Sequence, residues 1–264
     1  MERELPTAAE RIQTLAATIL ATHSAGYRLC LIGGFRYRLL NASARTSTDI
    51  DYHCDGDLQA KQTEIVDVLR GKLLPEVKRQ LGYDGDVQPA TGPEAESPAV
   101  RIIEMAFYRI AEPGSRIEIP IEITRVVRLD APVVRTLAGT VYLTVSDADM
   151  IESKIIALLN SRYCRVRDVL DIFLFQDSLS ADAPARLLKK LSLLVMPIVD
   201  AIAAVDRFET NRAVHVRELD RLLHEQVDAP VSANLRAAGG AAMVWDAVFR
   251  LLRDTLTKAK EPAT

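Results

Sequence analysis

Apolar residues recur at helical spacing close to the start of the chain. Thr7 and Glu10 have the spacing of a capping box, which predicts a helix that begins here and runs to about Thr22. The apolar side chains of this stretch fall on one side of such a helix: Ile12, Leu15, Ile19 and Leu20. The first element is therefore predicted to be an amphipathic helix with one buried face.

The next apolar stretch is short and ends at a pair of glycines. Residues 27–32 predict a buried strand bounded by Gly33-Gly34. Two glycines let the backbone turn sharply and approach a ligand closely, because no Cβ intervenes. Residues 35–40 predict a short helix whose N-terminus points at this turn, and residues 49–52 alternate as a second strand would.

A long amphipathic stretch then gives way to strands. Residues 58–81 predict a helix that ends at Gly82 and that Pro75 kinks. Residues 100–108 predict one strand, and residues 116–124 predict another from their strict alternation of isoleucines with polar residues.

Polar residues of the 116–124 strand share the face opposite the isoleucines: Glu118, Pro120 and Glu122. Proline has no N–H to donate to a neighbouring strand, so the strand is predicted to lie at a sheet edge or to be bulged at Pro120. One interpretation of the two glutamates is therefore an edge strand with charged, outward-facing side chains.

From Ser146 onward the pattern is helical. Ser146 is a good N-cap for a helix that includes residues 151–159, and a second helix is predicted to begin near Arg165. Further helices are predicted over three stretches: residues 184–207, 212–226 and 241–259. The fold class is thus α+β, with a mixed sheet and helices in a first domain (residues 1–145) and helices alone in a second (residues 146–264).

Composition narrows the class of protein. The 264 residues are 48% hydrophobic and 26% charged, which is typical of a soluble globular protein with a sizeable core. No apolar run approaches the roughly 20 residues that span a bilayer, and no signal peptide is recognisable, so we expect a cytoplasmic protein with no membrane partner. The net charge of −3 gives no global basic field, so any nucleic-acid surface is a local patch. Three cysteines without metal-ligand spacing argue against a disulfide framework or a zinc site.

Candidate chemistry centres on the glycine pair and on Asp49-Ile50-Asp51. Residues two apart on a strand lie about 6.5–7 Å apart on one face, so both carboxylates can lean towards shared cations. Carboxylates together with substrate phosphates are the ligands that suit Mg²⁺. The alternative is a surface strand with two solvated aspartates. The glycine turn after a predicted strand, and the Arg/Ser/Thr-rich turn that includes Arg45 and Ser47, favour a site.

This arrangement resembles the DNA polymerase β-like nucleotidyltransferase superfamily, in which a Gly-Gly or Gly-Ser turn holds a triphosphate and an Asp-x-Asp strand binds metal. The superfamily places a third metal-binding carboxylate on a later strand. By this resemblance Glu122 is the first choice for that role and Glu118 the second, because position alone does not separate them. Many relatives carry a small or hydroxyl residue after the glycines, whereas Phe35-Arg36 follow here. The bulky Phe35 either alters how the triphosphate sits or packs against the first helix.

A second set of charged residues narrows the resemblance. Lys154 is followed by Arg162 and Arg165, and then by Asp168-x-x-Asp171. This order resembles the AbiEii/AbiGii-type nucleotidyltransferase toxins of type IV toxin–antitoxin and phage-defence systems. Taken by itself, Lys154 reads as a solvated lysine, and the two aspartates read as surface ion-pair partners of nearby arginines worth only about 0.3–0.5 kcal/mol per pair.

The resemblance implies a two-metal nucleotidyltransferase. Two Mg²⁺ are expected on Asp49, Asp51 and Glu122, and an NTP on a site that comprises Gly33, Gly34, Arg45, Ser47 and Lys154. Asp168 is expected to orient Lys154 or the substrate. The implied acceptor is an RNA or tRNA 3′ end, and a cognate antitoxin protein is a possible partner.

Two other functions stay open at this point. One is a catalytically silent nucleotide-binding or partner-binding module, against which the complete carboxylate set argues. The other is a nucleotidyltransferase for a small molecule such as an antibiotic, which would use the same metal site with another acceptor pocket. Incubation with labelled NTPs, Mg²⁺ and total RNA distinguishes them by where the label appears.

Overall fold

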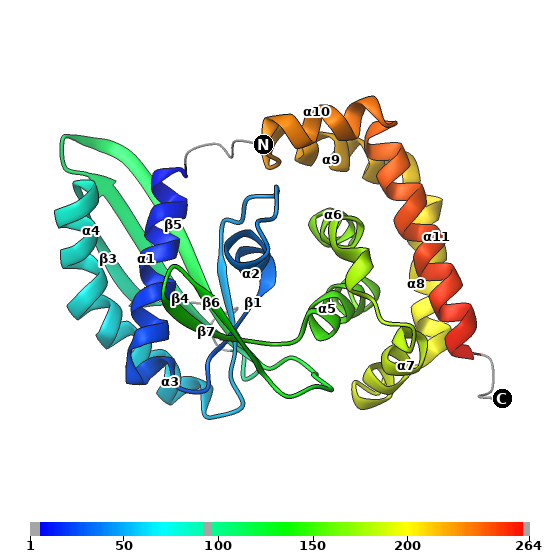
Figure 1. Cartoon of the computed structure of the whole chain (residues 1–264), viewed down its shortest axis with the longest axis horizontal. Coiled ribbons are helices and arrows are strands. Elements are labelled where there is room, and N and C mark those ends of the chain that lie inside the picture. Colours follow the sequence, from blue (N-terminus) through cyan, green and yellow to red (C-terminus); the bar gives the residue numbers. More distant parts are fainter. Residues whose placement is uncertain (1–5, 92–96, 261–264) are drawn as a thin grey trace. The chain divides into compact units, whose positions relative to one another are not determined.

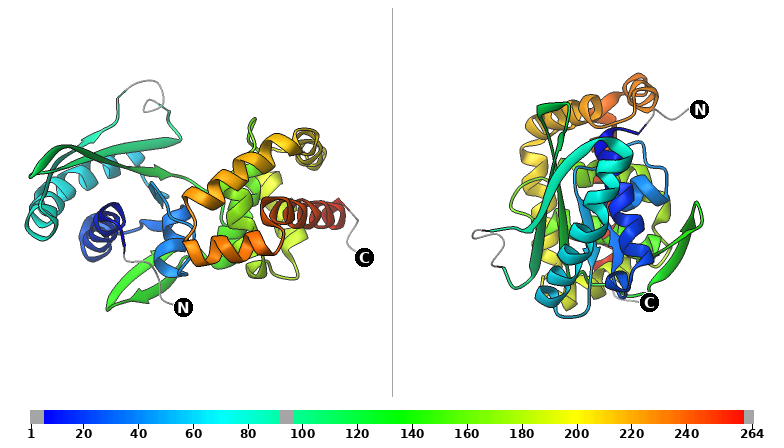
Figure 2. Two further views of the ribbon diagram at one scale, coloured as in Figure 1. Left: turned by 90° about the horizontal axis from the view of Figure 1, so that it is seen from above. Right: turned by 90° about the vertical axis from the view of Figure 1, so that its left-hand side faces the viewer.

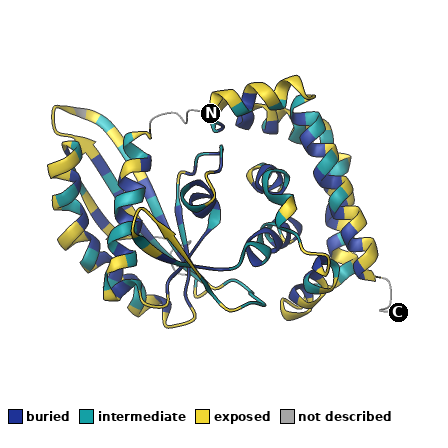
Figure 3. Cartoon of the chain, viewed as in Figure 1, coloured by how far each residue is buried: buried dark blue, intermediate teal, exposed yellow. Residues whose placement is uncertain are grey.

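The computed structural model describes residues 6–91 and 97–260 of the chain (Figure 1). Within them the chain forms two compact units. The first comprises residues up to 126 together with 132–145, and the second comprises residues 127–131 together with 146 onward. Each unit has its own buried residues, visible as dark blue segments on one side of most helices in Figure 3. The two units are therefore described separately.

A mixed seven-stranded sheet forms the centre of the first unit, in the order β3-β4-β5-β2-β1-β7-β6. The pairs β2–β5 and β1–β7 are parallel and the other neighbours are antiparallel. The strands are β1 (Cys30–Ile32), β2 (Ile50–His53), β3 (Tyr83–Pro89), β4 (Val100–Arg109), β5 (Glu112–Thr124), β6 (Val133–Leu137) and β7 (Thr140–Thr144). The predicted α+β class with an N-terminal mixed sheet is confirmed. The β6–β7 hairpin had not been predicted.

Helices pack on one face of this sheet and close its hydrophobic core (Figure 2). They are α1 (Ala8–Thr22), α3 (Leu58–Val68) and α4 (Leu74–Leu81), while α2 (Gly33–Leu40) follows β1 directly. The predicted first helix and its capping box are confirmed, because the Thr7 side chain accepts from the Glu10 N–H and the Glu10 carboxylate accepts from the Thr7 N–H. Its predicted apolar face is buried at Ile12 and Leu20.

Two boundaries near the glycine pair differ from the prediction. The strand begins at Cys30 instead of residue 27, because Arg28 has a left-handed backbone with a φ of 64° and breaks the extended run. The following helix begins at Gly33, so both glycines lie in its first turn. The N-cap residue Ile32 has no side-chain hydrogen bond to this turn.

The predicted 58–81 helix is continuous but changes its winding in the middle. Residues Leu69–Leu73 form a π-helical turn between α3 and α4, and Gly82 ends α4 in the left-handed conformation with a φ of 71°. Pro75 lies at the start of α4, where a missing N–H is tolerated. The irregularity expected at Pro75 is thus a wide turn just before the proline.

The prediction that the 116–124 strand lies at a sheet edge is wrong. It is β5, which pairs with β4 on one side and with β2 on the other. Pairing with β2 begins at Ile121, one residue after Pro120, so on that side the proline has no neighbouring strand to which it would donate. An interior strand can hold this proline because the neighbouring strand β2 has not yet begun at that point.

Helices alone form the second unit, as predicted. They are α5 (Asp147–Leu159), α6 (Val166–Phe175), α7 (Ala183–Leu193), α8 (Ile198–Thr210), α9 (Arg212–Glu225), α10 (Ala229–Ala237) and α11 (Gly240–Lys260). Ser146 caps α5 by accepting from the Asp149 N–H at 3.0 Å, which confirms its predicted role. The single helix predicted over residues 184–207 is two helices, because Val195 adopts a φ of 55° and Pro197 follows. No helix in the described ranges is long and apolar enough to cross a membrane.

Candidate active site

The Asp51 carboxylate lies directly against Gly33. A Cβ placed on Gly33 would stand 1.7 Å from Asp51 Oδ2, and Gly33 has a φ of 76°. Both the contact and the positive φ exclude a side chain at this position. The glycine is therefore required where the β1–α2 turn meets the second aspartate of the Asp-x-Asp strand.

Gly34 is packed by two other residues that the sequence had suggested. A Cβ on Gly34 would lie 2.3 Å from Arg45 Nη2 and 2.8 Å from Ser47 Oγ. Ser47 Oγ in turn donates to Asp49 Oδ1 at 2.6 Å. The turn before β2 thus brings the arginine, the serine and the first aspartate onto the glycine pair.

Strand register places Glu122 beside Asp51. In the parallel β2–β5 pair Asp51 is the direct partner of Glu122, and laterally paired residues of neighbouring strands face the same side of a sheet. Glu118 lies four residues earlier on β5, beyond the end of the β2 pairing, and forms a 2.8 Å ion pair with Arg116 on the surface. Of the two glutamates, Glu122 is the one next to the aspartates.

Two buried residues that sequence reasoning missed hold the turn before β2. Gln13 on α1 is 1% exposed and its Nε2 donates to the carbonyl oxygens of Ser47 and Asp49, at 2.9 and 3.4 Å. Arg38 on α2 forms a 2.7 Å ion pair with Glu10 and donates to the carbonyl of Ser43 at 2.8 Å. The detectable signal was a glutamine on the otherwise apolar face of the first helix.

The residues after the glycines are structural in this fold. Phe35 is 1% exposed and belongs to the hydrophobic core that includes α1, which is the second of the two alternatives for this residue. Arg36 is fully buried, and its Nε donates to Thr144 Oγ1 at 3.0 Å. Thr144 Oγ1 donates to the carbonyl of Leu31 at 2.6 Å, so Arg36 helps to join α2, β1 and β7.

Lys154 lies in the second unit and is held by two buried carboxylates. Its Nζ is 2.9 Å from Asp168 Oδ1 and 3.0 Å from Asp171 Oδ2. Its side chain is 14% exposed and those of the aspartates 2% and 1%, so the interpretation as a solvated surface lysine is wrong. Arg165 does pair with Asp168 at 2.6 Å, but on a buried carboxylate, and the four residues form one charge-balanced cluster.

None of the three cysteines is a good candidate for a catalytic nucleophile. Cys30 and Cys54 are buried, and all three thiols are free, as expected. Burial, together with the smaller effect of the nearby carboxylates of Glu218 and Asp168, raises the pKa of Cys164 to about 12. Its thiol is therefore protonated at neutral pH and unsuited to nucleophilic attack.

The carboxylates of the first unit are the residues that fit a divalent cation. Asp49, Asp51 and Glu122 offer hard oxygen donors, which suit Mg²⁺, and the missing Cβ of Gly33 lets the Asp51 carboxylate lie against the glycine turn. Across residues 6–91 and 97–260, no three Asp, Glu, His or Cys side chains are gathered closely enough to form a ready-made metal cage. The donor set fits Mg²⁺ that keeps waters and also binds substrate phosphates.

Three solved structures are similar to this chain over most of its length. A putative nucleotidyltransferase from Helicobacter pylori is 18% identical with a TM-score of 0.56, and the match covers 98% of this chain and 100% of that one. JHP933 from Helicobacter pylori is 18% identical with a TM-score of 0.54 and coverages of 95% and 92%. The nucleotidyltransferase toxin MenT4 from Mycobacterium tuberculosis is 15% identical with a TM-score of 0.48 and coverages of 97% and 96%. The likeness to the two Helicobacter pylori structures shows the fold.

The sequence itself supplies the family. No curated protein matches the chain in sequence. Residues 14–236 match the family described as nucleotidyl transferase AbiEii toxin of the type IV toxin–antitoxin system, and this range includes both groups of charged residues described above. The chain therefore belongs to the AbiEii family of nucleotidyltransferase toxins.

Proposed function

We propose that this protein transfers a nucleoside monophosphate from an NTP to an acceptor hydroxyl, in the cytoplasm, with Mg²⁺ held by Asp49, Asp51 and Glu122. The observation that carries the proposal is the direct pairing of Asp51 with Glu122, beside a glycine turn against which the Asp51 carboxylate is packed. Bound Mg²⁺ would supply charge neutralisation on the phosphates and activation of the acceptor hydroxyl.

The chain's own residues would bind and orient the triphosphate. The first turn of α2 contains Gly33 and Gly34, and its N-cap Ile32 provides no side-chain acceptor, which leaves N–H groups for phosphate oxygens. Arg45 and Ser47 lie against Gly34. Arg45 would donate to the same phosphate, and Ser47 would do so by turning its hydroxyl proton away from Asp49. Gln13 would act as a positioning residue, because it holds the backbone of Ser47 and Asp49 in place.

Residues 1–145 would serve as the nucleotidyltransferase domain and residues 146–264 as a helical domain that supplies Lys154 to catalysis. In this role Lys154 would offset the negative charge of the triphosphate, as phosphoryl-transfer sites require. Asp168 and Asp171 would fix the position of the ammonium group, because both accept from Lys154 Nζ. A phosphate would share the lysine with these two carboxylates.

The leading acceptor is an RNA or tRNA 3′ end, by family resemblance. The decisive experiment incubates the purified protein with each labelled NTP, Mg²⁺ and total RNA. Label on RNA supports this acceptor, and label on a small molecule added in its place supports the second candidate below. No label on either, from a folded protein with all four NTPs, would contradict the proposal. A cognate antitoxin is a further proposed partner, tested by loss of toxicity on co-expression.

Two matched variants test the carboxylate assignment. Asp51→Asn is expected to abolish transfer while leaving the fold intact, because the substitution removes charge without changing shape. Glu122→Gln is expected to do the same, whereas Glu118→Gln, on the same strand but paired with Arg116, is expected to lose little. A folded Asp51→Asn variant with near wild-type turnover would overturn the metal assignment. Loss of activity in Glu118→Gln but not in Glu122→Gln would identify Glu118 as the third metal ligand.

A second acceptor class is favoured by the charge of the neighbouring sheet surface. A groove of about 500 Å³ extends from Glu122 across β5, β4 and β3, and its charged lining residues are four carboxylates and one guanidinium: Asp86, Glu104, Glu118, Glu122 and Arg116. An acidic groove attracts a small polycation and repels an RNA backbone. An antibiotic-type amine acceptor is therefore the alternative, and an aminoglycoside in the labelling assay is its test.

A further inference from the structure

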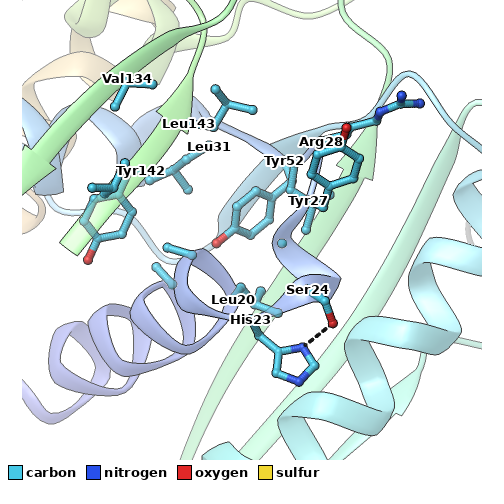
Figure 4. Close-up of a pocket in the computed structure, with 15 residues that line it drawn as sticks. Leu20, His23, Ser24, Tyr27, Arg28, Leu31, Tyr52, Val134, Tyr142 and Leu143 are labelled. Atoms are coloured by element: carbon cyan, nitrogen blue, oxygen red, sulfur yellow. Dashed lines mark hydrogen bonds between the residues drawn. The ribbon is translucent and has the colours of Figure 1, made fainter.

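A cavity of about 360 Å³ lies in the first unit, between the end of α1 and strands β1, β2, β6 and β7 (Figure 4). Its walls are mainly aliphatic, from Ala17, Leu20, Ala21, Leu31, Val141 and Leu143. Tyr52, which also lines it, follows Asp51 on β2 and therefore faces the opposite side of the sheet from that carboxylate. The cavity is thus separate from the proposed catalytic residues, and its volume is in the range of about 300–1,000 Å³ of small-molecule sites.

The Tyr52 hydroxyl is a donor that the described part of the fold does not use. The residue as a whole is 4% exposed, but its oxygen is not among the fully buried polar atoms, and Tyr52 lines the cavity. Figure 4 shows its ring among the lining side chains, with the hydroxyl on the side of α1. The other phenol of the cavity, Tyr142, is already bonded to Thr18 Oγ1 at 2.9 Å. Phenylalanine would supply the same apolar ring, so what tyrosine adds at this position is a hydroxyl that can donate into the cavity.

Water is a poor partner for this hydroxyl. A stably buried water makes hydrogen bonds to two to four polar groups, and the walls around Tyr52 are mostly aliphatic. Burial raises the pKa of Tyr52, and the proximity of Tyr142 raises it further, so the phenol keeps its proton and can donate. An acceptor that enters with an apolar body can therefore replace water at this hydroxyl.

The lining also restricts the charge of an occupant. Among the lining residues Arg28 carries the permanent charge, and it is exposed at the rim, where its guanidinium lies 5.2 Å from the centre of the Tyr27 ring. His23 Nδ1 accepts from the Ala25 N–H at 3.1 Å, which places its proton on Nε2 in the neutral form. Among the residues that the structure describes, no carboxylate lines the cavity, and no lining charge is buried beside Tyr52. An ionic group inside would lack a counter-charge and pay the full desolvation penalty.

We propose that this cavity binds an uncharged, largely apolar small molecule of aromatic size whose single acceptor, a carbonyl or ether oxygen, receives a hydrogen bond from Tyr52. The site is independent of nucleotidyl transfer, and its test does not use activity.

The probe is Prodan, an uncharged naphthalene ketone whose emission moves to shorter wavelength in apolar surroundings and to longer wavelength when its carbonyl accepts a hydrogen bond. Titration of the full chain is expected to show saturable binding with blue-shifted emission. The anionic naphthalene anilinonaphthalene sulfonate is expected to bind at least about tenfold more weakly, because its sulfonate finds no buried counter-charge. Tighter binding of the anion would overturn the proposed ligand class.

Two pairs of variants locate the probe. Tyr52→Phe is expected to weaken Prodan about three- to tenfold, the effect of one hydrogen bond, and to shift its bound emission further to the blue. Tyr83→Phe, at another buried tyrosine of this unit, is the control. Ala21→Trp fills the cavity and is expected to abolish binding, whereas Ala60→Trp on the exposed side of α3 is expected to leave it unchanged. Circular dichroism confirms the fold of each variant. Unchanged affinity and emission in Tyr52→Phe, or equal binding by the two tryptophan variants, would refute the site.

Discussion

Two lysines of the helical unit are each held by two carboxylates, and they differ in how far they are sealed from solvent. Lys154 on α5 binds Asp168 and Asp171 and keeps 14% of its side chain exposed. Lys190 on α7 lies 2.7 Å from Asp149 Oδ1 and 2.9 Å from Glu152 Oε2, and it is 1% exposed. Similar pairing chemistry thus occurs once at the edge of solvent and once within the core.

The surroundings of Lys190 are those of a structural network. Arg186 bonds Glu152 and forms a two-pronged contact of 2.9 Å with both oxygens of Asp130. Asp149 also accepts from the N–H groups of Leu129 and Asp130, each at 2.9 Å. The network thereby fastens residues 127–131 to α5 and α7.

The comparison teaches that a charge pattern in the sequence does not show how far a lysine is sealed from solvent. The spacing of Lys154 to Asp168 and Asp171 resembled a family motif, whereas Lys190 was preceded by Lys189 and had no pattern around it. A sealed ion pair has no access to a ligand and contributes to fold specificity or stability. A partly open one is available for catalysis.

The largest effect is expected on stability, from Lys190→Ala. The variant leaves Asp149 and Glu152 buried without their ammonium partner, and breaking a buried pair costs about 3–5 kcal/mol. Urea unfolding measures the change in the free energy of unfolding. A loss below about 1 kcal/mol would mean that Arg186 alone satisfies both carboxylates, and the structural role of Lys190 would be lost.

The next effect is expected on activity, from Lys154→Ala. If this lysine offsets triphosphate charge, kcat/KM falls about 100-fold or more, which is about 2.7 kcal/mol at the transition state. Because Asp168 and Asp171 also lose a partner, the assay is run well below the melting temperature measured for the variant. A folded variant that keeps most of its kcat/KM would place Lys154 in the same structural class as Lys190.

A smaller effect is expected in acid. The hydrogen bond from Arg186, with a second from Ser146, holds the pKa of Asp130 below its usual range. A carboxylate with a lowered pKa in the folded state stabilises the protein above its unfolded pKa of about 4, and this stability is lost as the pH falls through the folded value. Because Asp130 is partly exposed, its share is at most about 1 kcal/mol. Urea unfolding between pH 6 and pH 3 should therefore show a shallower loss for Asp130→Asn than for wild type. Equal slopes would exclude this contribution.

The smallest effect is expected from Lys189→Ala. This lysine is exposed on α7, directly before Lys190, and surface substitutions usually change stability by less than about 0.5 kcal/mol. Both the free energy of unfolding and kcat/KM should stay near wild type. A loss comparable to that of Lys154→Ala would show that any positive charge on these helices matters, and would end the distinction between the two lysines.

Most of the helices and strands that were predicted correctly have a recognisable local sequence signal. The capping box at Thr7 and Glu10, the Ser146 cap and the αL glycine at Gly82 each act within one helical turn, so they can be recognised without knowledge of the rest of the chain. Errors arose where a backbone conformation left no residue-type signal. Arg28 and Val195 adopt positive φ although neither is a glycine; the first delays the start of a predicted strand and the second ends a predicted helix early.

The sequence alone determined the fold class, the nucleotidyltransferase family and the two groups of charged residues. Tertiary structure decided which carboxylate lies beside Asp51, because the register between β2 and β5 joins residues about 70 positions apart and singles out Glu122 over Glu118. It also decided that Gln13 supports the turn before β2, and that Lys190 is sealed in the core. Strand register and burial are set by packing across the whole chain, so neither can be read from a local pattern of residues.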